Sequence, residues 1–275
     1  MPVRASHRSL LIGCGLFLAA ATPAAAAPVT PGGNPPVVDL QLVLAVDVSR
    51  SMDFNEQRIQ RDGYVAAFKS PEVQKAISSG PYGRIAITYV EWSGAFFQRV
   101  LVPWHILSSD EDILAFADAL AKAPLEVDNR TSISGGLLFA SSLFITSGVV
   151  SDRMTIDVSG DGANNEGPSL PPIRDRIVKS GININGLPIL LDPSPTLGAF
   201  GRVSLQDYYE DCVIGGPGAF VIPILTLQDF APAIRRKLIL EIAAVTPQVV
   251  PVLDQPLGRP KVDCLLAENL RTGGP

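Results

Sequence analysis

The stretch LVLAVDVSRSM, residues 42–52, joins a continuous apolar run to a short polar turn that contains Asp47, Ser49 and Ser51. The strand-like segment extends back to residue 37 and is rich in β-branched side chains. An uninterrupted run of this kind is typical of a strand that is buried on both faces of a parallel sheet. It predicts an α/β fold in which Asp47 lies at the carboxyl end of a buried strand.

The remainder of the chain alternates between strand-like and helix-like patterns. Further strands are expected at residues 83–92 and 96–104, joined as a hairpin through Ser93 and Gly94, and at 153–159, 182–190 and 219–225. Helices are expected from a capping-box-like Asp53-x-x-Glu56 to just before Pro71, and at 110–121, 132–146, 171–181 and 229–244. This order predicts a doubly wound, mostly parallel sheet with one antiparallel edge strand and helices on both faces. Such sheets bind ligands beyond the carboxyl ends of their strands.

The two ends of the chain predict a processed leader and a tail. Residues 1–27 combine Arg4 and Arg8, an apolar run and small residues, as in a secretory signal peptide. The run of about a dozen apolar residues is too short to span a bilayer, so no transmembrane anchor is expected after cleavage. An LIGC sequence at 11–14 matches a lipoprotein box only superficially, because it starts the apolar run instead of ending it. The expected organisation is a signal peptide (1–27), a Pro/Gly-rich linker (28–37), one domain (38–244) and a Pro-rich C-terminal extension (245–275).

Net charge and cysteine content limit the classes of binding partner and the cellular compartments that are expected. The formal net charge is −5, and loss of Arg4 and Arg8 makes the mature chain more acidic. An acidic chain without a basic run argues against nucleic acid or anionic lipid as its main partner. A secreted chain would retain Cys212 and Cys264, which can form a disulfide between the tail and the domain. Two free or buried thiols remain the alternative.

Five oxygen-bearing side chains stand at the edges of predicted strands and helices. They are Asp47, Ser49 and Ser51 in the opening stretch, Thr131 in NRTSISGGL (129–137), and Asp161 in TIDVSGDGANN (155–165). A set with no sulfur and no imidazole suits a hard cation, Mg²⁺ above all, with Mn²⁺ or Ca²⁺ possible. The five residues are therefore the predicted metal site.

The order of these elements resembles the metal-ion-dependent adhesion site (MIDAS) of the von Willebrand factor A (vWA) domain family. The family pattern is Asp-x-Ser-x-Ser, then a distant Thr, then a distant Asp-Gly, and the resemblance covers residues 38–244. The phrases YVEWSG, DVSGDGANNEG and DCVIGGPGAF look like a secreted bacterial subgroup of unknown function. The resemblance implies a periplasmic or extracellular module that binds a protein ligand through a divalent cation. It also implies that a carboxylate of the partner fills the sixth metal position.

Each site residue has a simpler interpretation. Asp47 and Ser51 can merely cap the next helix, and Thr131 can be only the N-cap of its own helix. Asp157, four residues before Asp161, is a rival carboxylate, although a position inside an apolar strand suits a structural role better. Asn164, Asn165 and Glu166 are expected to form the rim of the site or else a solvated polar loop. The NRT sequence at Asn129 also matches a glycosylation sequon, which is a common chance match.

Catalysis is not expected, because a Ser nucleophile needs a base and the mature chain would retain only His105. The sequence has no phosphate-binding Gly-rich loop ending in Lys-Ser/Thr and no His/Cys zinc set. Two alternatives to a binding module remain: a Mg²⁺-dependent hydrolase, since aspartates with Mg²⁺ support phosphoryl hydrolysis, and a metal-independent structural or assembly factor. Metal titration separates the three classes.

Overall fold

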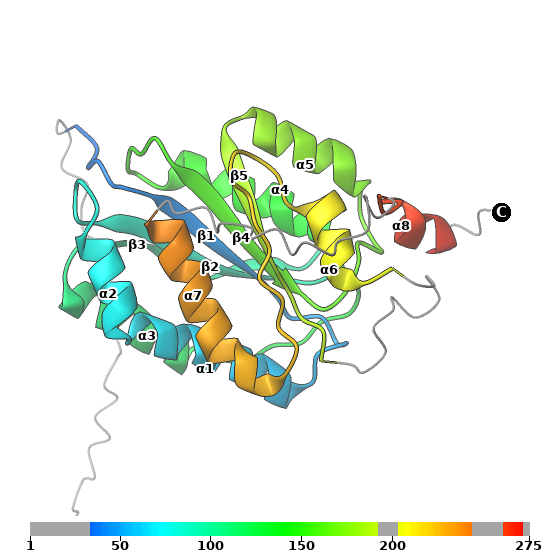
Figure 1. Ribbon diagram of the computed structural model, residues 1–275, viewed down its shortest axis with the longest axis horizontal. Coiled ribbons are helices and arrows are strands. Elements are labelled where there is room, and N and C mark those ends of the chain that lie inside the picture. The colour runs from blue at the N-terminus through cyan, green and yellow to red at the C-terminus, as the bar shows by residue number, and fades with distance from the viewer. Residues whose placement is uncertain (1–33, 192–202, 244–260, 272–275) are drawn as a thin grey trace, which may run out of the picture. The chain divides into compact units, whose positions relative to one another are not determined.

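The computed structural model is built on a five-stranded sheet in the order β3-β2-β1-β4-β5. The structure describes residues 34–191, 203–243 and 261–271. The chain separates into two units, Met1–Asn34 and Pro35–Pro275, and every element below belongs to the second. The strands are β1 (Gln41–Asp47), β2 (Ile85–Trp92), β3 (Gln98–Leu107), β4 (Met154–Gly160) and β5 (Ile182–Pro188). All neighbouring strands are parallel except β2 and β3, so the antiparallel edge strand is confirmed (Figure 1).

Helices cover both faces of this sheet, as predicted (Figure 1). Against one face pack α1 (Phe54–Phe68), α2 (Pro71–Ser78), α3 (Asp110–Lys122) and α7 (Phe230–Ile242). Against the other pack α4 (Ile133–Leu143), α5 (Leu170–Lys179), α6 (Leu205–Tyr208) and the π-helical turn η3 (Tyr209–Val213). Short 3-10 turns, η1 (Phe144–Thr146) and η4 (Leu227–Asp229), continue α4 and precede α7. A last helix, α8 (Leu266–Arg271), lies in the C-terminal extension.

Strand β1 explains why the opening sequence has no polar face. All seven of its residues are buried. Leu42 and Leu44 enter the core beneath α1 and α7, whereas Val43 and Ala45 enter the core beneath α4 and α5. Because side chains alternate across a strand, a central strand covered on both sides needs apolar residues at every position.

The helix boundaries follow local capping signals. Helix α1 begins with the expected capping box of Asp53 and Glu56. Helix α2 was not expected, yet Ser70 caps it and Pro71 occupies its first turn, which is a standard start signal. Helix α4 begins one residue later than predicted, because the hydroxyl of Ser132 accepts from Gly135 N at 3.2 Å.

The prediction of a continuous last strand at residues 219–225 is wrong. This segment runs parallel to β5 but forms only isolated bridges, Gly186 with Val221 and Ile189 with Ile224. The pairing is interrupted at Pro188, which has no N–H to donate at the position where a parallel ladder requires one. Hydrogen bonds resume beyond it, with Leu190 N donating to Ile224 O at 2.8 Å.

Several predicted segments lie outside the described residues. These are the signal peptide (1–27), most of the linker (28–37) and residues 245–260 of the C-terminal extension. In the part of the chain that the structure describes, no helix has the length and apolar character needed to cross a membrane.

Cys212 and Cys264 form a disulfide that ties the described end of the extension to η3. The contact is reinforced by Val262 N, which donates to Asp211 Oδ2 at 2.8 Å. Glu268 of α8 accepts from Asn164 Nδ2 at 2.8 Å and from Leu170 N at 3.0 Å. The end of the chain is thereby joined to the loop that follows Asp161.

Replacement of both Cys212 and Cys264 by Ser is expected to lower the free energy of unfolding by about 2–5 kcal/mol, because the bridge restricts the unfolded chain across 52 residues. Denaturant unfolding measures the loss. Protein that starts near Pro28, as N-terminal sequencing would show, should have no thiol that reacts with an alkylating reagent before reduction. Two alkylated thiols in the native protein would contradict the bridge.

Candidate metal site

The two carboxylates of the predicted site lie on adjacent strands. Asp47 is the last residue of β1, and Asp161 directly follows β4. The two strands pair in parallel, with Val46 opposite Ser159, so their carboxyl ends meet at one edge of the sheet. Burial, and secondarily the charge of Asp161, raises the pKa of the Asp47 carboxyl.

A continuous chain of hydrogen bonds connects four of the five predicted residues. Ser49 N donates to Asp47 Oδ1 at 2.7 Å, and the hydroxyls of Ser49 and Ser51 are 2.9 Å apart. Ser51 Oγ donates to Asp161 Oδ1 at 2.7 Å. Asp47 and Ser49 are buried at the base of this cluster, whereas Ser51 is exposed. The cluster therefore opens to solvent on one side.

Thr131 reaches the same place from the loop before α4. Its N–H donates to Asn165 Oδ1 at 3.1 Å, and its carbonyl accepts from Asn165 N at 2.9 Å. A Cβ built on Gly162, the residue after Asp161, would lie 3.4 Å from Thr131 Oγ1. Since Ser132 caps α4, the Thr131 hydroxyl is not needed as a helix cap. It receives no hydrogen bond from the residues that the structure describes.

The electrostatics of the cluster favour a cation. Burial raises the pKa of Asp47 well above the usual range for a carboxyl, and the nearby charge of Asp161 raises it further. Burial likewise raises the pKa of Asp161. Asp47 Oδ2 is fully buried and has no hydrogen-bond partner among the described residues. A bound cation would pair with this oxygen and reverse the pKa shifts.

The donor set fits a hard ion. It contains two carboxylates and three hydroxyls, and oxygen donors of this kind suit Mg²⁺, Mn²⁺ or Ca²⁺. Nowhere in the described residues do three His, Cys, Asp or Glu side chains gather as a metal-binding group. Any metal at this edge would therefore depend on the hydroxyls.

Two residues beside Asp47 were not singled out from the sequence. A Cβ at position 160 would lie 2.8 Å from Asp47 Oδ2 and 2.9 Å from the Tyr209 hydroxyl, so Gly160 allows both groups to approach the strand. Tyr209 is fully buried, and its pKa is raised first by burial and then by the charge of Asp47. The Asp-Gly motif pointed toward Gly162, and no local signal marks Tyr209, which comes from the distant η3.

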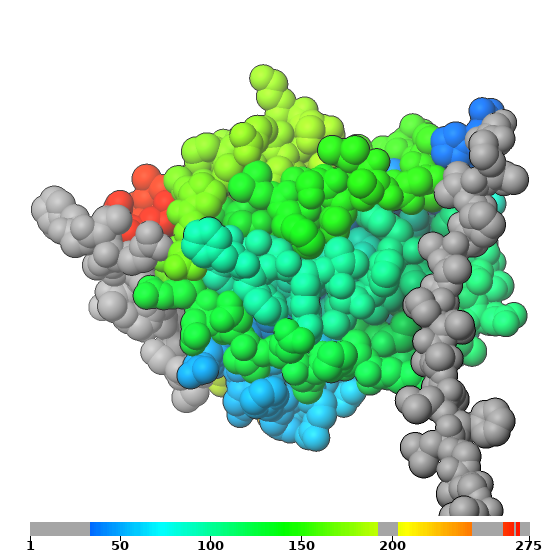
Figure 2. Space-filling model, turned by 180° about the vertical axis from the view of Figure 1, so that it is seen from behind, coloured from blue at the N-terminus to red at the C-terminus, as the bar shows by residue number. Residues whose placement is uncertain are grey.

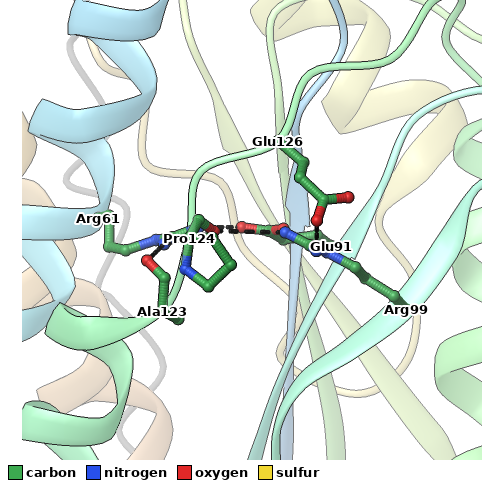
Figure 3. Close-up of polar contacts among 6 residues, drawn as sticks. All are labelled: Arg61, Glu91, Arg99, Ala123, Pro124 and Glu126. Carbon is green, nitrogen blue, oxygen red and sulfur yellow. Dashed lines mark hydrogen bonds and ion pairs between the residues drawn. The ribbon is translucent and has the colours of Figure 1, made fainter.

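A buried ionic network holds the loop that leads to Thr131 (Figure 3). Glu91 of β2 has no exposed side-chain area and forms ion pairs with Arg61 of α1 and Arg99 of β3. Arg61 Nη1 also donates to the carbonyls of Ala123 and Pro124, at 2.7 and 3.2 Å, and Arg99 pairs with Glu126. The network thus fixes the start of the loop against two strands and a helix.

The end of that loop is joined directly to the site. Asp128 N donates to Val48 O at 3.2 Å, and Asp128 Oδ2 accepts from Ser93 Oγ at 3.1 Å. Ser132 N donates to Ser93 O at 2.6 Å. Asp128 was not predicted, and its role depends on pairing between segments that are far apart in the sequence.

The prediction that Asn164 forms part of the rim is wrong, because its side chain is completely buried. Asn164 Oδ1 accepts from Ser134 N at 3.0 Å, and Asn164 Nδ2 donates to Pro168 O and Glu268 Oε1. It therefore joins α4, the loop after β4 and α8. Asn165 and Glu166 are partly exposed. Glu166 Oε2 accepts from Ala95 N at 2.8 Å and so links this loop to the β2–β3 turn.

Asp157, the rival of Asp161, belongs to a different group. It is 1% exposed and its Oδ1 lies 2.8 Å from Lys237 Nζ of α7. Lys237 Nζ is also 2.5 Å from Glu241 Oε1, and Asn185 Nδ2 donates to the same oxygen at 2.9 Å. This buried group, defined here as the Asp157–Lys237–Glu241 triad, accounts for Asp157 as a structural carboxylate.

The sheet order and the helices on both faces match the fold of vWA-type domains. A structure of proximal thread matrix protein 1 from the mussel byssus is similar, with a TM-score of 0.54 and 15% identity over 75% of this chain and 47% of that chain. The pilus adhesin SpaC from Lactobacillus rhamnosus GG, in its open conformation, gives 0.53 and 13% over 76% of this chain and 31% of that chain. Another structure of the mussel protein, described as having a zinc-occupied MIDAS motif, gives 0.53 and 13% over 77% and 49%. The chain thus spans less than half of each of these proteins.

The chain belongs to the DUF1194 family, described as proteins of unknown function, whose model matches residues 37–246. A comparison with curated protein sequences finds no significant match.

Proposed function

We propose that this protein is a secreted, divalent-cation-dependent protein-binding module of the MIDAS type. The observation that carries the proposal is the buried cluster in which Asp47, Ser49, Ser51 and Asp161 are linked by hydrogen bonds while one carboxylate oxygen of Asp47 is left without a partner. Two vWA-fold neighbours are described as a pilus adhesin and as a protein with a metal-occupied MIDAS motif, which supports the same class of function.

The five residues of the site differ in charge and in exposure, and each would contribute differently to metal binding. Asp47 and Asp161 would supply negative charge, and Ser49, Ser51 and Thr131 would supply neutral oxygens. When bound, Mg²⁺ would offer Lewis acidity to an incoming oxygen ligand, because the hydroxyls leave its charge only partly neutralised. The exposed side of the cluster at Ser51 is where a carboxylate of the partner protein would enter. Mn²⁺ and Ca²⁺ are the alternative ions on the same donor chemistry.

The proposed location is the bacterial periplasm or the exterior of the cell, after removal of residues 1–27. The leader-like sequence and the disulfide of Cys212 and Cys264 support an oxidising compartment. The test is affinity purification from the native envelope fraction with the mature protein as bait. We expect a partner that is retained in Mg²⁺ and lost both with chelator and with Asp161→Ala bait. Equal retention in all three conditions would contradict metal-dependent binding.

The purified protein is expected to show no esterase, protease or phosphatase turnover, with or without divalent metal. His105 is the only histidine in the described residues, and it lies on β3 opposite Ile87 of β2. Ile87 precedes Trp92, the residue paired with Asp47, by five positions, or roughly 16 Å along a strand. The one imidazole among the described residues is therefore too far from the site hydroxyls to act as their base. Metal-dependent turnover that disappears in Ser49→Ala and survives further purification would favour a hydrolase instead.

A further inference from the structure

The candidate metal site is surrounded by a continuous rim built from turns that are distant in the sequence. The β2–β3 turn, residues 93–97, contacts the loop after β4 through the hydrogen bond from Ala95 to Glu166. It contacts the loop before α4 through Ser93 and Ser132. The β1–α1 turn contacts that same loop through Val48 and Asp128. In Figure 2 the teal segment, which includes the β2–β3 turn and β3, lies at the surface of the domain.

The carboxylates and the arginines of this rim differ in whether they have hydrogen-bond or ion-pair partners within the protein. Its carboxylates accept hydrogen bonds within the protein: Glu166 from Ala95 N, Asp128 from Ser93 Oγ, and Asp53 and Glu56 from each other's N–H. Arg50 and Arg130 are exposed, and neither has a hydrogen bond or ion pair with any residue that the structure describes. Each guanidinium has five donors in a planar fork that matches a carboxylate. Arg50 and Arg130 are therefore the charged side chains of the rim that have no partner among the described residues.

Arg130 is held in an unusual backbone conformation next to the site. Its φ is 75°, the only positive value for a non-glycine residue in the described part of the chain. Such conformations are strained and persist where the surroundings enforce them, commonly at binding sites. Asn165 forms hydrogen bonds with both the N–H and the carbonyl of the neighbouring Thr131. A Cβ on Gly94 would lie 3.4 Å from Arg130 Cβ, so Arg130 is adjacent to the β2–β3 turn.

Two aromatic side chains project from the same rim. Phe96, at the β2–β3 turn, is 99% exposed, and Phe54, the first residue of α1, is 63% exposed. Burial of an exposed Phe side chain against a partner surface would contribute favourable free energy to binding. Arg and aromatic residues are also enriched at protein interfaces. The rim thus combines free cations with an exposed apolar anchor.

We propose that the rim recognises an acidic peptide segment of the partner, in which a second carboxylate binds Arg50 or Arg130 and an apolar side chain packs on Phe96. The inference rests on the proposed function, because the first carboxylate is the one directed to the metal. The chain as a whole has a formal charge of −5, which opposes an acidic partner at long range. The two arginines supply the local attraction that an acidic segment needs.

The test is selection from a displayed library of random heptapeptides on the wild-type mature protein in Mg²⁺, followed by affinity measurement with the best synthetic peptide. We expect enriched peptides to contain at least two acidic residues and one large apolar residue. We expect the losses of peptide affinity caused by Arg50→Ala, Arg130→Ala and Phe96→Ala to amount together to about tenfold or more. Arg236→Ala on α7 and Ile145→Ala on η1 are matched controls outside the rim and should bind as wild type does.

The outcomes separate the two proposals. Enriched peptides without excess acid, no enrichment at all, or unchanged affinity in all three rim variants would overturn the acidic-segment inference. If binding needs Mg²⁺ and Asp161 but not the rim residues, the metal-dependent function stands and this inference fails. If binding depends on the rim residues but survives chelator and Asp161→Ala, recognition of an acidic segment by the rim stands without the metal, and the metal-dependent function fails. Arginine-dependent binding to phosphatidylglycerol vesicles, with no peptide enriched, would identify a membrane surface instead.

Discussion

Asp47→Ala and Asp161→Ala are each expected to abolish the rise in melting temperature that Mg²⁺ produces in the wild-type protein. Stabilisation by a bound ion follows mass action and reaches about 2.7 kcal/mol at a hundredfold excess over the dissociation constant. Each variant removes one of the two negative charges in a cluster otherwise built of hydroxyls. Differential scanning calorimetry with and without saturating Mg²⁺ or Mn²⁺ measures the shift.

The variants should still fold without metal, and Asp47→Ala should be no less stable than the wild type in chelator. Burial and the charge of Asp161 raise the pKa of Asp47, which means that the ionised carboxylate is unfavourable in the absence of a cation. Asp62→Ala is the matched control, because Asp62 is an exposed aspartate on α1. Asn164→Ala is unsuitable as a control, since Asn164 is buried and bonded to Ser134 and Glu268. An equal Mg²⁺ shift in wild type and Asp47→Ala would show that the metal binds elsewhere.

The strand positions and the meeting of Asp47 with Asp161 were predictable from sequence, and both have the same cause. Strands covered on two faces are predominantly apolar, so their ends are marked where runs of polar residues begin. Parallel pairing then brings the carboxyl ends of β1 and β4 together without any knowledge of side-chain contacts. The antiparallel edge was predictable because only a short turn separates β2 from β3. A turn of this length permits a hairpin but not the crossover connection that a parallel pair needs.

The parts that could not be predicted depend on pairing between distant segments. Asn164 and Asn165 are neighbours of the same type, and contacts with distant segments, α4 and α8 among them, distinguish the buried first residue from the partly exposed second. The place of Tyr209 beside Asp47 depends likewise on how η3 packs against β5. The cap of α4 was ambiguous for a different reason, because Thr131 and Ser132 are both good capping residues and differ by one position.

The buried position of Glu91 was equally hidden, since a charged residue in YVEW gives no local sign of its partners Arg61 and Arg99. Charged residues are almost never fully buried unless they are paired. A single glutamate within an apolar strand could therefore have suggested an ion pair, although not with which cations.

Lys237→Met is expected to lower the free energy of unfolding at neutral pH by about 3–5 kcal/mol, the cost of removing one partner from a buried ion pair. Lys237 is fully buried, and its ammonium is the only cation paired with Asp157 and Glu241 among the described residues. Methionine has a similar volume, so the loss should come from charge more than from packing. Chemical denaturation measures it. Lys69→Met, which breaks an exposed ion pair with Asp118, is the matched control and should change stability little.

The pH dependence of stability provides the sharper test of the triad. Burial, and secondarily the charge of Glu241, raise the pKa of Asp157 to about 7 in the folded protein, although Lys237 opposes the shift. The unfolded carboxyl titrates near 3.8, so between pH 4 and 7 the folded state holds a proton that the unfolded state has lost. The contribution of Asp157 to stability is therefore greatest below about pH 4 and declines as the pH rises to about 7. Asp157→Asn should remove this decline, and Lys237→Met should be less destabilising at pH 4, where Asp157 is protonated. A loss in Lys237→Met that is the same at pH 4 and pH 7 would show that the lysine acts through packing and not through its charge.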